Sequence, residues 1–120
     1  MVLMCDYQTG FVPPEMIKKR RVVVLSPKFI NNRGLCTIAP ISTSEPEREY
    51  PFHVKIEAGN YSFHSKRQPC WVKCDILSSV SYKRLDRIRI GNQFVAPRIS
   101  HADFERIKAA AIHVVSGHIS

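Results

Sequence analysis

Residues 18–27 read KKRRVVVLSP, and this stretch decides the fold. The β-branched run from Val22 to Val24, extended by Leu25, is stopped by Pro27. A short, continuous apolar run of this kind is typical of a central strand that is buried on both faces. Four basic residues come directly before the run, so the strand begins with a dense positive charge. The stretch therefore predicts a core strand that leads out of a basic surface.

The flanking sequence predicts further short strands. Val2 to Tyr7 is apolar enough for a first strand, and the segment from Tyr50 to Ile56, YPFHVKI, alternates like a half-buried strand. Gly91-Asn92 separates two extended runs and predicts a two-residue hairpin turn. Strands are also expected at 35–42 and 70–77, with mobile polar loops at 44–49 and 58–69.

Only the end of the chain has helical periodicity. Ser100 is a suitable N-cap, and Asp103 follows three residues later. Apolar residues then recur at spacings of 3, 4 and 3, which predicts a helix over about 101–115. We therefore expect a mainly β fold, a small antiparallel barrel or strongly bent sheet capped by this helix, in one domain that covers residues 1–120.

Charge and cysteine usage restrict the class of protein. The 120 residues carry a net charge of +8, so a polyanion is the first partner to consider. The opening segment meets Asp6 too early for the apolar core of a signal peptide, and no run is long enough to span a membrane. The four cysteines lack the C-x2-C knuckles of structural zinc sites. We expect reduced thiols in the cytoplasm, and neither a metal nor a cofactor.

Five short motifs follow one another along the chain: Asp6 in the opening strand, Glu15 with KKR (18–20) before VVVLSP, APISTS (39–44), YPFHV (50–54), and VKCD (72–75) before a basic turn. Together they resemble the MazF/PemK toxins of bacterial type II toxin-antitoxin modules, over residues 2 to 115. The resemblance implies an SH3-like β-barrel that forms a homodimer. It also implies metal-independent cleavage of single-stranded RNA, and an antitoxin protein that occupies the RNA groove.

Cleavage of RNA without a metal uses the 2′-hydroxyl as the nucleophile, so the protein has to take a proton, donate one and stabilise charge on phosphorus. Arg20, which we expect on an exposed loop, matches the motif arginine and suits a phosphate because its guanidinium is always charged and bidentate. Ser42 stands where the family has threonine and offers a hydroxyl donor. Lys73 and Asp75 are predicted on one face of a strand, as an acid and base pair whose order stays open.

The resemblance extends RNA binding to a wider set of residues. Some family members have a histidine where this chain has Pro14, so no motif histidine serves as the base. The motif proline is also replaced by a basic residue, which adds positive charge to the groove. The expected RNA contacts are Glu15, Lys18, Lys19, Arg21, Thr43 and Arg84.

Other interpretations remain open from the sequence. The basic run 18–21 also fits a solvated surface, and Lys73 with Asp75 also fits a surface ion pair. A ribonuclease that uses His53 and His64 is a further hypothesis. The same fold would also serve a non-catalytic toxin that binds a protein such as gyrase, or a nucleic-acid-binding module without nuclease activity.

Overall fold

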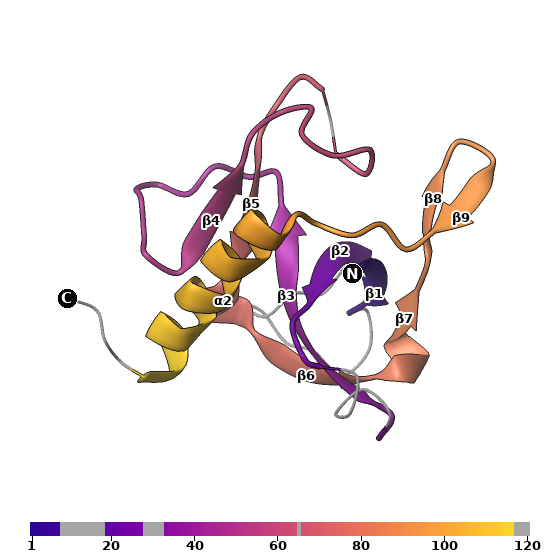
Figure 1. The fold of residues 1–120 in the computed structure, drawn as a ribbon, viewed down its shortest axis with the longest axis horizontal. Coiled ribbons are helices and arrows are strands. Elements are labelled where there is room, and N and C mark those ends of the chain that lie inside the picture. The colour runs from indigo at the N-terminus through magenta and orange to yellow at the C-terminus, as the bar shows by residue number, and fades with distance from the viewer. Residues whose placement is uncertain (8–18, 28–32, 65, 117–120) are drawn as a thin grey trace.

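We analysed the chain as a computed structural model, which describes residues 1–7, 19–27, 33–64 and 66–116. Short strands dominate the described part, and one long helix closes it (Figure 1). The strands are β1 (Val2–Asp6), β2 (Lys19–Val24), β3 (Leu35–Ser42), β4 (His53–Ile56), β5 (Cys70–Lys73), β6 (Ser78–Ser81), β7 (Leu85–Asp86), β8 (Ile88–Ile90) and β9 (Gln93–Val95); the helices are the 3-10 turns η1 (Cys74–Ile76) and η2 (Tyr82–Arg84) and the α-helix α2 (His101–Ser116).

The main sheet is antiparallel and has β2 near its centre. Its order is β4-β5-β3-β2-β1-β7, and β6 also pairs with β3. The predicted core strand is confirmed, because Val22, Val23 and Val24 are all buried between β1 and β3. The mainly β class with a C-terminal helix is confirmed as well, and β8 and β9 form the predicted hairpin around Gly91, whose φ of +61° suits a residue without a Cβ.

Two hydrophobic clusters lie on opposite faces of the central strands. Alternation along β2 sends Val23 into the larger cluster, which Ile107 of α2 completes, and Val22 into the smaller one. The helix lies against β4 and η1 (Figure 1). Its start is capped as predicted, because the Asp103 amide donates to Ser100 Oγ at 3.1 Å. The helix therefore covers the face of the sheet that carries the larger cluster.

Two predicted strands are shorter than expected. The strand predicted at 70–77 ends at Lys73, where the chain turns into η1 and the Leu77 amide donates to the Cys74 carbonyl at 3.2 Å. The strand predicted at 50–56 begins only at His53, because its amide closes a turn on the Tyr50 carbonyl at 3.2 Å. In both places a local backbone hydrogen bond replaces the ladder, which periodicity alone does not predict.

The segment predicted as a mobile polar loop at 58–69 is held to the rest of the fold. Phe63 is buried in the larger cluster, and Tyr61 stacks on it with 5.2 Å between the ring centroids. The Tyr61 hydroxyl bonds to Ser100 and Asp103 at the start of α2. The isolated aromatic pair therefore ties the middle of the segment to the core and to the start of α2.

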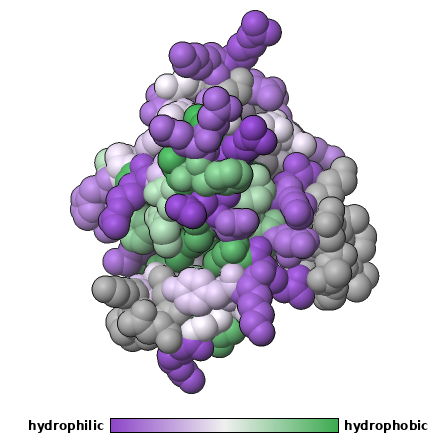
Figure 2. Space-filling model, turned by 90° about the vertical axis from the view of Figure 1, so that its right-hand side faces the viewer, coloured by the Kyte–Doolittle hydropathy of each residue, from purple (hydrophilic) through white to green (hydrophobic). Residues whose placement is uncertain are grey.

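The surface combines charged side chains with local hydrophobic areas. Figure 2 shows, on the side that carries the β8–β9 hairpin, hydrophobic side chains at the centre with hydrophilic side chains around them. Phe94 of β9 is among the exposed large hydrophobic residues. Within the described ranges, no helix is long and apolar enough to cross a membrane.

Candidate functional site

The basic residues at the start of β2 divide between the two faces of the sheet. Lys19 is opposite Asp6 of β1 and Arg20 is opposite Cys5, so their side chains point to opposite faces. Arg20 and Arg21 are half-buried strand residues. The expectation of an exposed loop arginine was therefore wrong, since the strand begins earlier than the apolar run that marks it in the sequence.

Strand register places Arg20 beside Ser42. The backbone pairing between β2 and β3 ends with Val22 opposite Pro40, and Arg20 and Ser42 lie two residues beyond this pair on the two strands. Residues opposite each other in an antiparallel pair share a face, so both side chains face the same side of the sheet. The Arg20 Nε atom is buried, and no described residue accepts its hydrogen. This guanidinium therefore has a donor available for an anion.

The Ser42 hydroxyl is held in place at the end of β3. Ser42 is buried, and its Oγ accepts a hydrogen bond from the Ser44 amide at 3.1 Å. An acceptor role on one side leaves the hydroxyl hydrogen to donate elsewhere. Thr43, the alternative hydroxyl, is exposed immediately after the strand.

Asp75 pairs with His53 and not with Lys73. Because β5 ends at Lys73, Asp75 lies in η1 and does not share a strand face with the lysine. The Nε2 atom of His53 lies 2.8 Å from Asp75 Oδ1, and the His53 side chain is 8% exposed against 41% for Asp75. Among the described residues no ion pair joins Lys73 to Asp75. The predicted same-face pair was wrong, although all three residues stay close, since His53 is opposite Lys73 across β4 and β5.

The surroundings of His53 fix its orientation. The ring makes edge contacts with Tyr50 and Phe52, at centroid distances of 5.3 and 4.8 Å. Its Nδ1 atom is buried without a described partner, so we assign the hydrogen to Nε2, which donates to Asp75. The alternating YPFHVKI pattern places His53 on the polar face of its strand, but only the tertiary fold shows that Asp75 faces it.

The candidate residues occupy neighbouring rows on one face of the sheet. Across β2, β3, β5 and β4, one row contains Arg20, Ser42, Trp71 and Lys55. The next row toward η1 contains Lys73 and His53. Adjacent strands are about 4.8 Å apart, so a few nucleotides of RNA can span the set. A phosphate-binding arginine, a hydroxyl donor and an ammonium thus face the same side, and the Asp75 carboxylate is joined to them through His53.

A second basic group lies on a different part of the surface. Lys19, Lys83, Arg84 and Arg87 line a cavity of about 230 Å³ together with Asp6 and Asp86. The Arg84 guanidinium donates to the Asp6 carbonyl at 3.1 Å, which ties η2 to β1. The structure therefore brings the predicted contacts Lys19 and Arg84 together.

Among the remaining predicted contacts that the structure describes, Arg21 joins neither group. The Arg21 guanidinium donates to the Phe63 carbonyl on the core side of the sheet. Glu15 and Lys18 lie outside the described residues.

Several buried titratable groups have shifted pKa values. Burial lowers the pKa of His64, and the neighbouring Arg21 lowers it further. Burial raises the pKa of the Cys70 thiol to about 11 and that of Cys74 to about 12. The four cysteines are free and buried. Within the described part of the chain, no group of three or more His, Cys, Asp or Glu is arranged to hold a metal ion.

Comparisons with known proteins identify the relatives of this chain. The family model for PemK-like, MazF-like toxins of type II toxin-antitoxin systems matches residues 1–115. The Escherichia coli K12 protein YifN is 33% identical over 117 residues, which cover 92% of this chain and 77% of YifN.

Solved structures confirm the fold that the motifs implied. MazF from Deinococcus radiodurans has a TM-score of 0.68 at 19% identity, covering 96% of this chain and 92% of that one. An endoribonuclease from a mycobacterial species, solved in complex with its cognate antitoxin, has a TM-score of 0.65 at 15% identity, with coverages of 96% and 90%. The full-length family match and the shared fold together show that this chain belongs to the PemK-like, MazF-like toxins of type II toxin-antitoxin systems.

Proposed function

We propose that the chain is a toxin that cleaves single-stranded RNA at short sequences without a metal ion, and so inhibits translation and growth. The proposal rests mainly on one observation: Arg20 and Ser42 are neighbours on one face of the sheet. Lys73 and His53 occupy the next row of that face, and His53 contacts Asp75. Membership of a toxin family with endoribonucleases among its structural neighbours supports it.

The phosphate is bound first. Arg20 donates to two oxygens of the scissile phosphate with its planar guanidinium, which keeps its charge at every working pH. Ser42 adds its hydroxyl hydrogen to one of the same oxygens. Both donors act most strongly on the extra negative charge that develops on phosphorus in the transition state.

Asp75 and Lys73 then carry out the two proton transfers. Asp75 removes the proton of the 2′-hydroxyl, and the 2′-oxygen forms a bond to phosphorus. The bond from phosphorus to the 5′-oxygen breaks, and Lys73 donates a proton to that oxygen. The products are a 2′,3′-cyclic phosphate and a 5′-hydroxyl. In this scheme His53 touches no reacting atom; it is a positioning residue that holds the Asp75 carboxylate through its Nε2 hydrogen.

Other basic residues guide the RNA beyond the cut. The cavity that contains Lys19 and Arg84 offers several cations to backbone phosphates, and exposed Thr43 offers a second hydroxyl beside Ser42. Glu15, Lys18 and Arg21 remain predicted contacts. Because each neutralised phosphate releases counterions, RNA binding is expected to weaken steeply as salt rises.

We also propose a cognate antitoxin, a homodimer and a cytoplasmic location, since messenger RNA is translated there. The mycobacterial relative with its cognate antitoxin supports the first of these. Light scattering on the purified chain, alone and with the co-expressed neighbouring gene product, measures both assemblies. A chain that stays monomeric and binds no such product would contradict this part of the proposal.

The test of activity is incubation of the purified chain with a long single-stranded RNA in EDTA, beside an Arg20→Ala control. Discrete cuts with cyclic-phosphate ends, absent in the control, are expected. Intact RNA after incubation with folded, antitoxin-free protein would refute the proposal and favour a non-catalytic toxin of the same fold.

A further inference from the structure

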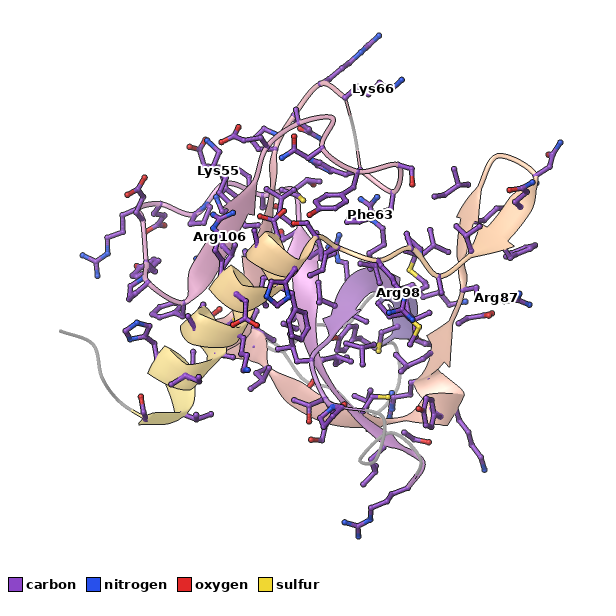
Figure 3. All side chains as sticks on the ribbon, in the orientation of Figure 1. Lys55, Phe63, Lys66, Arg87, Arg98 and Arg106 are labelled. Carbon is purple, nitrogen blue, oxygen red and sulfur yellow. The ribbon has the colours of Figure 1, made fainter. Side chains whose placement is uncertain are left out.

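A cavity of about 370 Å³ opens on the same sheet face as the proposed catalytic residues. Trp71 and Lys55 form one wall, the loop of residues 45–50 forms another, and Arg106 of α2 lies at the edge. Arg106 donates to the Lys55 carbonyl at 3.2 Å, and Figure 3 shows the two side chains next to each other. The edge strand and the helix thus give the cavity a fixed border.

The cavity begins one strand away from Ser42. Trp71 lies directly opposite Ser42 across β3 and β5, and the wall of residues 45–50 continues from the end of β3. Neighbouring strands are about 4.8 Å apart. A phosphate held by Arg20 and Ser42 therefore leaves an adjacent nucleotide within reach of the cavity.

The aromatic groups around the cavity suit a flat ligand. Phe52 stacks on Tyr50 with 4.9 Å between the ring centroids, and the Arg48 guanidinium also lies over the Tyr50 ring, 4.9 Å from its centroid. The exposed Arg48 guanidinium is a surface on which a nucleobase can stack, and the largely buried indole of Trp71, which is 9% exposed, contributes to the cavity lining beside it. The volume is at the low end for small-molecule sites and fits one base better than a longer stretch of RNA.

The pairing of the charged groups in the walls favours a base edge over a phosphate. Three cations line the cavity beside three carboxylates, but Lys55 is paired with Glu57 at 3.8 Å and Arg106 with Asp103 at 3.0 Å. Glu45, Glu47 and Glu49 line the cavity, and within the described residues none of them has an ion-pair or hydrogen-bond partner. Three carboxylates repel a phosphate, but they accept hydrogen bonds from an exocyclic amine. Cytosine, adenine and guanine carry such an amine, and uracil does not.

We propose that this cavity binds one amino-bearing base next to the scissile phosphate and thereby contributes to the choice of cleavage sequence. The inference rests on the proposed function, because it takes the substrate to be single-stranded RNA. It goes beyond that function by assigning a base-selective subsite to Trp71, Arg48 and the three glutamates.

The test reads binding without cleavage. Trp71 is the only tryptophan of the chain, so its fluorescence reports occupancy of the cavity. The probes are 2′-O-methyl tetracytidylate and 2′-O-methyl tetrauridylate, which cannot be cleaved through a 2′-hydroxyl. We expect the cytidylate to quench Trp71 at a concentration about tenfold or more below the uridylate, as one base-edge hydrogen-bond pattern predicts.

Variants separate the cavity from general RNA binding. A triple variant with Glu45→Gln, Glu47→Gln and Glu49→Gln should lose the base preference while still being quenched. The matched control is Glu57→Gln, because the Glu57 carboxylate lies 3.8 Å from the Lys55 ammonium but does not line the cavity; this variant should keep the base preference. Equal quenching by both probes, no quenching, or an unchanged preference in the triple variant would overturn the proposal. If the protein shows the base preference but cleaves no RNA, only the proposed activity is refuted. If it cleaves RNA but shows no base preference, only the proposed role of the cavity is refuted.

Discussion

The hydrogen bond from His53 to Asp75 gives a quantitative prediction. His53→Phe removes both ring nitrogens but keeps a planar ring for the edge contacts with Tyr50 and Phe52. A hydrogen bond to a charged group is worth about 1.5–3 kcal/mol. Because Asp75 is 41% exposed, water replaces part of that bond, and the lower end of the range applies. A loss of about 1.4 kcal/mol in the barrier lowers kcat roughly tenfold.

The assay is cleavage kinetics on a single-site RNA oligonucleotide. We expect His53→Phe to lower kcat and leave KM unchanged, since His53 contacts the Asp75 carboxylate, the proposed general base, and not the RNA phosphate. His53→Gln keeps an N–H donor and should recover most of the rate, which a packing role would not explain. Thermal unfolding checks that each variant folds. Wild-type kcat in His53→Phe, with Asp75→Asn impaired, would refute the positioning role.

Three other predictions follow from the same geometry. Arg20→Ala should lower kcat by about 10²–10³-fold, with Arg20→Lys intermediate, because one preorganised donor to the developing charge is worth that much. Single-turnover kinetics measure the rate of the chemical step, and equal rates in wild type and Arg20→Ala would exclude Arg20 from catalysis. Asp75→Asn should lower the rate far more than RNA affinity, and equal losses of both would contradict a role in proton transfer. Because the pKa of buried His64 is lowered, the unfolded state binds its proton first, so stability should fall as the pH drops below about 6.5. Urea titrations at several pH values should show that the free energy of unfolding falls less with decreasing pH in His64→Phe than in wild type. The same pH dependence in both proteins would exclude His64 as the cause.

Much of the fold was predictable because the local signals agree with the tertiary structure. Residues 22–24 are all apolar, which predicts a strand with two apolar faces, and their side chains are buried on both faces of the sheet. The Ser100 cap and the Gly91-Asn92 turn depend on short-range chemistry, which the sequence contains in full. Two strand ends were misplaced because hydrogen bonds from Leu77 to Cys74 and from His53 to Tyr50 depend on the local path of the backbone.

The candidate site was less predictable, because its residues come from four strands and a turn. The motifs pointed to Arg20, Ser42, Lys73 and Asp75, but periodicity placed Asp75 on a strand that has already ended. His53 lies within the YPFHV motif, but the resemblance assigned it no role. Its link to Asp75 spans 22 residues and exists only once β4 and η1 are packed together.

The most direct test of the central claim is a single change in the substrate. Once a cleavage site is mapped, an oligonucleotide with a 2′-deoxy nucleotide on the 5′ side of the cut removes the proposed nucleophile and leaves every protein contact intact. We predict that this RNA binds with normal affinity and is not cleaved in EDTA. Cleavage of the deoxy substrate at the normal rate would contradict attack by the 2′-hydroxyl, and with it the roles assigned to Asp75 and Lys73.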